Sequence, residues 1–151
     1  MSEAVPIVGR GFAFDDLKVG FRFRTHRRTI AESDLTAFVN LTWLTEELFT
    51  VADDAGRAIK GRAVPAALVY SFAEGLLLPT MQDTGLAFLN ATLDVKGPTL
   101  VGDTLHVECE VTEHRLTSKG DRGLVRFSNR VITQENRVVL EYNPLRMLKR
   151  K

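Results

Sequence analysis

Two adjacent carboxylates are the side chains best suited to proton transfer. Glu46 and Glu47 lie between the aromatic residues Trp43 and Phe49. A carboxylate held against apolar side chains becomes a better proton acceptor near neutral pH, so each glutamate is a candidate general base. The alternative interpretation is that both are solvated charges on a short helix.

Four further polar residues are candidates for binding a ligand. Asn40 and Thr42 offer an amide and a hydroxyl that can orient a water molecule or a carbonyl group, although local loop hydrogen bonds explain them as well. Ser71 and Glu74 lie one helical turn apart in an otherwise apolar stretch. Burying either without a partner costs about 1–3 kcal/mol, so we expect backbone groups or a partner subunit to satisfy them unless a substrate does.

The remaining reactive residue types indicate no further chemistry. The single cysteine, Cys109, lies on the apolar face of an alternating run and is predicted to be a small core residue. No set of His, Asp and Glu residues has the spacing of metal ligands, so we predict no metal and no other cofactor.

Composition narrows the class of protein. The chain has 151 residues, 44% hydrophobic and 26% charged, which is typical of one globular domain. Twenty Lys and Arg against nineteen Asp and Glu leave a net charge of +1, which does not favour nucleic-acid binding. The sequence shows neither a signal peptide nor an apolar run that would span a membrane, so we expect a cytoplasmic setting.

These residues must be positioned by helices in the first half of the chain. Residues 1–13 are expected to form a flexible arm, followed by a turn at 14–20 and an edge strand over 21–28. Helical spacing predicts a helix over 32–40 and a shorter one over 45–51. Residues 66–78 are apolar nearly all round, so they predict a central helix wrapped by protein on most sides and ended by Pro79.

The second half predicts strands. Apolar and polar residues alternate over 89–95, 105–111, 125–131 and 138–142, while 146–151 reads as a solvated basic tail. Strands that follow one another without intervening helices are antiparallel neighbours. The predicted fold is therefore α+β, an antiparallel sheet curled around one central apolar helix, which is the hot-dog arrangement. An exposed edge strand predicts dimerisation edge to edge.

Five segments in order resemble the MaoC-like hydratase branch of the hot-dog superfamily. They are Arg-Thr-Ile-Ala-Glu-Ser-Asp-Leu from 28, Leu-Thr-Trp-Leu-Thr-Glu-Glu-Leu-Phe-Thr from 41, Gly-Arg-Ala-Val-Pro-Ala-Ala-Leu from 61, Gly-Pro-Thr-Leu-Val-Gly-Asp-Thr-Leu from 97, and Thr-Ser-Lys-Gly-Asp-Arg-Gly-Leu-Val from 117. The resemblance covers residues 14–148 and implies one MaoC-like hot-dog domain.

The chain departs from this family at the catalytic positions. The family's hydration motif implies an Asp and a His, and alignment places Leu44 and Phe49 there, neither of which can move a proton. The family's central helix opens with His-Gly, whose glycine N–H polarises the thioester carbonyl. Here Pro65 and Ala66 take those places, and Ala66 still offers its N–H at a helix N-terminus.

The resemblance implies a protein that binds an acyl-CoA or acyl-carrier-type thioester through a degenerate or rearranged hydratase site. The rearranged site would use Glu46 or Glu47 as its base. One alternative is a hot-dog thioesterase with Glu74 directing water to the carbonyl carbon. Another is the non-catalytic subunit of a heteromeric hydratase. The expected assembly is a homodimer, a higher oligomer of dimers, or a heteromer with a catalytic hot-dog subunit.

Overall fold

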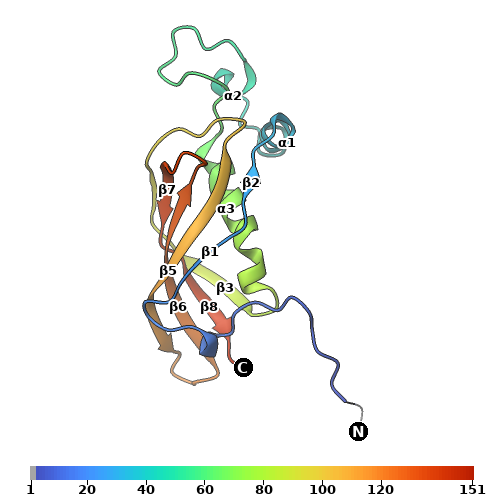
Figure 1. Ribbon diagram of the computed structural model, residues 1–151, viewed down its shortest axis with the longest axis vertical. Helices are drawn as coiled ribbons and strands as arrows, with labels where there is room; N and C mark the ends of the chain where they lie inside the picture. The colour runs from blue at the N-terminus through green and yellow to red at the C-terminus, as the bar shows by residue number, and fades with distance from the viewer. Residues whose placement is uncertain (1–2) are drawn as a thin grey trace.

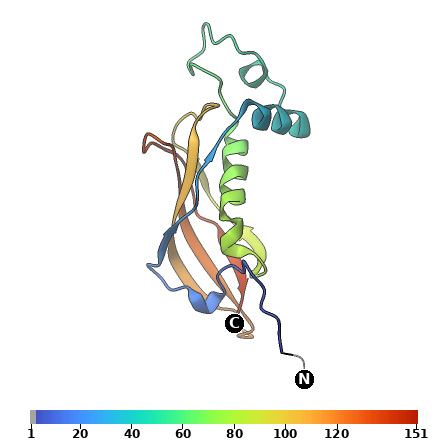
Figure 2. The same ribbon diagram turned by 45° about the vertical axis from the view of Figure 1, so that its right-hand side comes forward.

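The computed structural model describes residues 3–151 and contains a curled antiparallel sheet packed against one long helix (Figures 1 and 2). The helices are η1 (Phe14–Asp16), α1 (Glu32–Thr42), α2 (Glu47–Thr50) and α3 (Ala66–Met81). The strands are β1 (Arg22–Arg24), β2 (Arg28–Thr29), β3 (Gly85–Asn90), β4 (Leu93–Val95), β5 (Thr104–Leu116), β6 (Arg122–Ile132), β7 (Val138–Tyr142) and β8 (Leu145–Lys149).

The strands form one antiparallel system around the long pair β5–β6. The order along the main path is β1-β5-β6-β7-β4, with β2 also pairing β5 and with β8 lying between β6 and β3. Figure 2 shows the sheet curving along one side of α3, with α1 across the N-terminal end of that helix. The predicted α+β hot-dog arrangement is confirmed.

The core lies between α3 and the concave face of the sheet. The buried side of α3 carries Leu68, Val69, Phe72, Ala73 and Leu77, which pack against inward residues of β5, β6 and β7. The opposite side of the helix is exposed in this protomer, at Ala67, Ser71, Gly75 and Leu78. The expectation of a helix wrapped on most sides is therefore wrong for the single chain, because the sheet curls around only one side of it.

Pro79 does not end the central helix, which continues to Met81. A proline inside a helix removes the N–H that would bond the carbonyl four residues earlier, here Gly75. Gly75 and Pro79 both lie on the exposed side, where water can satisfy that carbonyl. The missing hydrogen bond is therefore tolerated at this position.

Two strand predictions also need correction. The run 89–95 is divided into β3 and β4, which pair with different neighbours, β8 and β7. Residues 146–149 are not a solvated tail but most of β8, in which Arg146 and Leu148 are buried. Their basic side chains find carboxylates from distant parts of the chain: Glu74 binds Arg146, and Asp83 binds Lys149.

The N-terminal segment joins the domain just before η1. The N–H groups of Gly11 and Phe12 donate to the carbonyls of Gln82 and Thr80, at 2.9 and 2.8 Å.

Within residues 3–151 no helix has both the length and the apolar run needed to cross a membrane.

Candidate functional site

An apolar pocket of about 240 Å³ opens beside the N-terminal end of α3. Phe49 and Ile59 come from the segment before the helix, Ala66 and Val69 from the helix itself, and Val95 from β4. Thr99 contributes the only polar side chain among the thirteen residues that line it. The lining contains neither a carboxylate nor an imidazole, so nothing in the pocket wall can transfer a proton near neutral pH.

The N-terminus of α3 is held at this pocket by the loop before β5. Val64 N–H donates to the carbonyl of Thr99 at 3.0 Å, and Val101 N–H donates to the carbonyl of Arg62 at 2.9 Å. Pro65 is the N-cap residue. Because the first N–H groups of a helix lack partners inside it, they need other acceptors. The N–H of Ala66 donates to no acceptor within residues 3–151 and remains available to a ligand.

The loop before β5 is itself braced by Asp103. Its carboxylate accepts hydrogen bonds from the Leu100 N–H at 2.8 Å and from the Gln134 side-chain amide at 3.0 Å. The Gly-Asp-Thr-Leu sequence therefore acts structurally, by fixing the turn that holds the start of α3.

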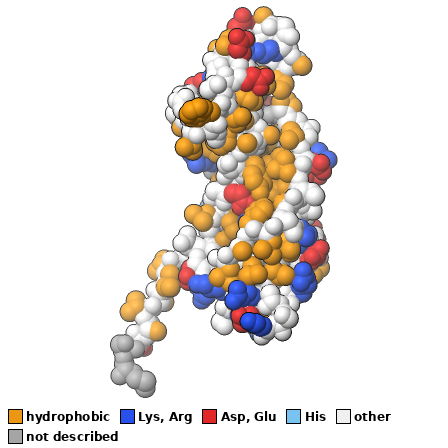
Figure 3. All heavy atoms as spheres, turned by 180° about the vertical axis from the view of Figure 1, so that it is seen from behind, with side chains coloured by type: hydrophobic (Ala, Val, Ile, Leu, Met, Phe, Trp, Pro, Cys, Tyr) orange, Lys and Arg blue, Asp and Glu red, His pale blue; other side chains and the backbone are white. Residues whose placement is uncertain are grey.

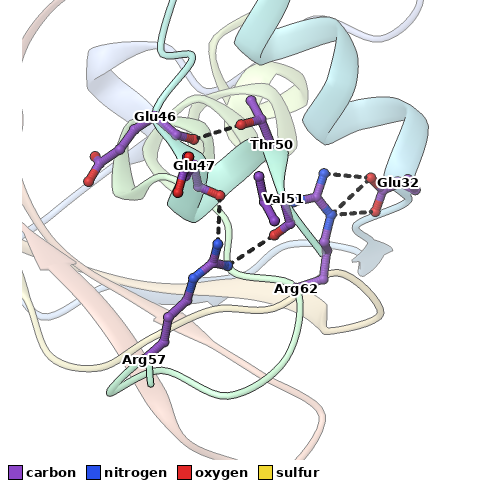
Figure 4. A network of polar contacts seen from close by, with 7 residues as sticks. All are labelled: Glu32, Glu46, Glu47, Thr50, Val51, Arg57 and Arg62. Carbon is purple, nitrogen blue, oxygen red and sulfur yellow. Dashed lines mark hydrogen bonds and ion pairs between the residues drawn. The ribbon is translucent and has the colours of Figure 1, made fainter. Parts of the chain in front are cut away.

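The segment around α2 is tied down through its backbone, as Figure 4 shows. The Arg57 guanidinium donates to the carbonyls of Glu47 and Val51, both at 3.0 Å, and Thr50 Oγ1 donates to the carbonyl of Glu46 at 3.1 Å. The two glutamate carboxylates take no part in these bonds. Both residues are exposed, and neither lines the apolar pocket.

A second connection in the same view joins α1 to the segment that leads into α3. Arg62 binds the Glu32 carboxylate through Nη2 at 2.8 Å and through Nε at 3.0 Å (Figure 4). Glu32 begins α1, where its charge also favours the positive end of the helix dipole.

The two predicted site residues of α1, Asn40 and Thr42, do not line the pocket. Asn40 and Thr42 are exposed, and Thr42 Oγ1 donates to the Phe38 carbonyl at 2.7 Å, a local helix bond. Trp43 ends the helix in the left-handed conformation, with φ 63° and 85% exposure. Of the residues predicted to catalyse or bind, only Ala66 lines the pocket, beside Phe49.

Comparison with solved structures reveals close similarity of fold. A protein named as a MaoC-domain dehydratase from Chloroflexus aurantiacus superposes with a TM-score of 0.90 at 23% identity, over 97% of this chain and 43% of that one. The (R)-hydratase PhaJ1 from Pseudomonas aeruginosa gives 0.75 at 25% identity, over 93% and 88%. A Mycobacterium tuberculosis protein with a double hot-dog fold gives 0.78 at 24% identity, over 97% and 46%.

The chain has the hot-dog fold of the MaoC-like dehydratases. It spans less than half the length of two of these three proteins. No family model and no curated protein matches its sequence.

This hot-dog domain places Ser71 and Glu74 outside the apolar pocket. Ser71 is exposed and its Oγ donates to the Ala67 carbonyl at 2.8 Å, so a backbone group satisfies it, as expected. The Glu74 carboxylate accepts two hydrogen bonds from Arg146 Nη2, at 2.8 and 2.9 Å. Its partner is thus a side chain of the same chain, 72 residues away in sequence.

Sequence reasoning missed Arg146 and the polar cluster around it. Tyr70 of α3 packs edge to face on Tyr142 of β7, with ring centroids 4.9 Å apart. The Tyr142 hydroxyl is buried near Asn129, and burial raises the pKa of Tyr142 well above its ordinary value. The one signal in the sequence was Glu74 itself, because a charged residue on a buried apolar helix needs a partner. That signal did not identify Arg146 as the partner.

Cys109 is buried in the same core, as predicted, and burial raises the pKa of its thiol to about 12. The thiol is therefore protonated and a poor nucleophile near neutral pH. Within residues 3–151, His, Cys, Asp and Glu side chains form no cluster of three able to hold a metal ion.

Proposed function

We propose that this chain is a MaoC-like hot-dog protein that binds the acyl group of an acyl-CoA or acyl-carrier thioester without hydrating it. The observation that carries the proposal is the composition of the pocket beside α3, which offers an apolar wall and a free helix N–H but no proton-transfer group.

The geometry supports binding of a carbonyl next to an apolar chain. The N–H of Ala66 lies at the positive end of the helix dipole and donates to no acceptor within residues 3–151, so a thioester carbonyl can accept from it. The pocket volume of about 240 Å³ lies below the roughly 300 Å³ at which drug-sized ligands begin to fit. A short acyl group therefore suits the pocket better than a bulky one.

Hydration of an enoyl thioester requires an acid and a base close to the double bond. At the positions where the resemblance implies these groups the chain carries Leu44 and Phe49, and Phe49 forms part of the pocket wall. A rearranged site would require Glu46 or Glu47 to reach the ligand from an exposed position outside that wall. This geometry favours a binding role over a rearranged hydratase.

A second hot-dog unit would complete the surface around α3. Large apolar side chains of β3 and β4 are partly exposed, namely Leu86, Phe88, Leu89, Leu93 and Val95. Figure 3 shows hydrophobic side chains gathered in a broad band on the face opposite that of Figure 1. Exposed apolar area of this kind is typical of an interface, and it supports a homodimer or a heteromer with a catalytic hot-dog subunit.

Turnover of short enoyl-CoA substrates tests the proposal directly. Loss of the conjugated thioester absorbance reports hydration, free thiol release reports thioester cleavage, and the melting temperature reports binding. We expect neither loss of absorbance nor release of thiol, and we expect a short acyl-CoA to raise the melting temperature. Hydration by the purified chain would contradict the proposal. The variants Glu46→Gln and Glu47→Gln would then test which glutamate acts as the base.

A pocket variant with a matched control separates specific from general binding. Ile59→Trp places an indole in the pocket wall and is expected to abolish the shift in melting temperature. Ile7→Trp makes the same substitution at an exposed residue outside the pocket and should leave the shift unchanged. Equal loss in both variants would show that the pocket is not the binding site.

The thioesterase alternative depends on Glu74. Its carboxylate accepts hydrogen bonds from Arg146, and the Glu74 side chain is 25% exposed, so water can still reach it. Thiol release that disappears in Glu74→Ala would favour this alternative over the proposed binding role.

A further inference from the structure

The apolar pocket beside α3 has one hydroxyl in its wall, that of Thr99, a residue only 4% exposed. The polar groups next to it are engaged. The Pro98 carbonyl accepts a hydrogen bond from Arg137 at 2.7 Å, and the Leu100 N–H donates to Asp103 at 2.8 Å. The Thr99 hydroxyl takes part in neither contact and forms no other hydrogen bond within residues 3–151. It is therefore available to whatever occupies the pocket.

Other buried threonines are arranged differently. Thr25 Oγ1 accepts a hydrogen bond from the Val107 N–H at 2.9 Å, so the protein itself satisfies that hydroxyl. The Thr84 hydroxyl lacks a partner but is fully enclosed by protein, where no ligand reaches it. Thr99 differs from both, because its side chain lies on the wall of a pocket and has no protein partner. A buried hydroxyl without a partner costs stability, and a ligand oxygen would remove that cost.

The backbone around Thr99 fixes its place in the pocket. The Thr99 carbonyl accepts a hydrogen bond from the Val64 N–H at 3.0 Å, and Ala63 pairs with Leu100 in an isolated antiparallel bridge. These contacts join the segment before β5 to the segment that leads into α3. Thr99 and Ala66 therefore line the same pocket in a fixed relationship, and each offers it a polar group.

We propose that Thr99 selects acyl groups that carry a hydroxyl or keto oxygen beyond the thioester carbonyl. The inference rests on the proposed acyl-binding function and names the ligand class of the same pocket. The thioester carbonyl accepts from the Ala66 N–H, and the second oxygen pairs with Thr99. A threonine hydroxyl can donate to a keto oxygen or accept from a hydroxyl. A saturated acyl group displaces water from the pocket and leaves the Thr99 hydroxyl unpaired, so it binds more weakly.

The composition of the pocket wall argues against two other roles for Thr99. A threonine acts as a nucleophile only where a nearby group takes its proton, and no residue of the wall can do so. A carboxylate on the acyl chain would be buried without a counterion, because the wall contains neither lysine nor arginine. A neutral oxygen is the group that suits this wall.

Calorimetric titration of the full chain with three thioesters of equal chain length tests the inference. The ligands are butyryl-CoA, 3-hydroxybutyryl-CoA and acetoacetyl-CoA. We expect at least one of the two oxygenated ligands to bind about tenfold more tightly than butyryl-CoA, the change that one well-placed hydrogen bond brings. Tighter binding of the hydroxy ligand identifies Thr99 as an acceptor, and tighter binding of the keto ligand identifies it as a donor.

Three variants assign the preference to the hydroxyl. Thr99→Val removes the hydroxyl and keeps nearly the same shape, so we expect the preference to disappear with little change in the affinity for butyryl-CoA. Thr99→Ser keeps the hydroxyl and should keep the preference. Thr36→Val makes the same substitution at an exposed threonine of α1 outside the pocket, and it should behave as the parent does.

The outcomes separate this inference from the proposed function. Equal affinity of the parent for all three thioesters would overturn the role of Thr99 and leave acyl binding in place. No heat with any of them would overturn both. A preference that persists in Thr99→Val would show that another group recognises the oxygen. The melting temperature of each variant shows that it has folded, and the comparison within the parent chain does not depend on any variant.

Discussion

The carboxylate of Glu74, in the middle of α3, accepts two hydrogen bonds from the guanidinium of Arg146 on β8. The Arg146 side chain is 7% exposed and that of Glu74 is 25% exposed. The pair joins the central helix to a strand near the C-terminus, and it places both charges next to the aromatic residues Tyr70 and Phe88.

Breaking this ion pair from one side should destabilise the fold. Glu74→Gln leaves the Arg146 charge buried without its counterion, so we expect the free energy of unfolding to fall by about 3 kcal/mol. Urea denaturation of the variant measures it. The double variant Glu74→Leu with Arg146→Met should recover much of the loss, since it removes both charges. A loss of less than about 0.5 kcal/mol in Glu74→Gln would show that the pair behaves like a surface contact.

The buried thiol predicts a dependence of stability on pH. Burial raises the pKa of Cys109 from 9.0 to about 12 in the folded protein. A raised pKa contributes stability that is fully present below the unfolded value and is lost as pH rises through the folded one. We therefore expect the free energy of unfolding to fall between about pH 9 and about pH 12, and to fall less in Cys109→Ala.

The rate of thiol labelling is an independent measure of how well Cys109 is buried. Cys109 should react with a thiol reagent at mildly alkaline pH only as fast as the protein opens, and at the rate of a free thiol once it is denatured. Rapid labelling of the native protein would contradict the placement of Cys109 in the core.

Gly123 is required by a close approach of η1 to the sheet. A Cβ atom at this position would lie 2.0 Å from a ring carbon of Phe14, so the ring would have to move. We expect Gly123→Ala to lower the free energy of unfolding by about 1–3 kcal/mol, the usual cost of overpacking. Gly75→Ala is the control, because a Cβ there meets nothing within 4 Å and alanine favours the helix.

Assembly through the sheet edge predicts a change of mass. Phe88→Asp puts a charge on β3, where the side chain is 45% exposed in this protomer. If a second hot-dog unit covers this strand, light scattering should show a dimer or larger assembly for the parent and a smaller species for the variant. Val19→Asp, at an exposed apolar residue outside the strands, should keep the parent mass. A monomeric parent protein would exclude the homodimer.

Much of the fold follows from local patterns in the sequence. The apolar run after Pro65 identified the central helix, and alternation over 105–111 and 125–131 identified the long strands β5 and β6. These patterns report which face of an element avoids water, and that preference depends on neighbouring residues only. That Leu44 and Phe49 stand at the family's proton-transfer positions also comes from residue types alone, and it stays a prediction.

Other features depended on contacts between distant residues. The basic residues at 146–151 read locally as a solvated tail, yet Glu74 provides the counterion that lets Arg146 enter the core as part of β8. Pro79 reads locally as a helix end, yet its exposed position lets the helix continue to Met81.

The division between these two groups has a physical reason. The sequence by itself determined the amphipathic faces and the single cysteine in the core, because each is a property of residue type and spacing. The absence of the family's catalytic pair stays a prediction. Only the tertiary structure decided that Ala66 and Phe49 share a pocket and that Glu46 and Glu47 lie outside it. Those relationships arise where the sheet curls and brings residues from distant parts of the chain within a few ångströms, and no local pattern encodes that proximity.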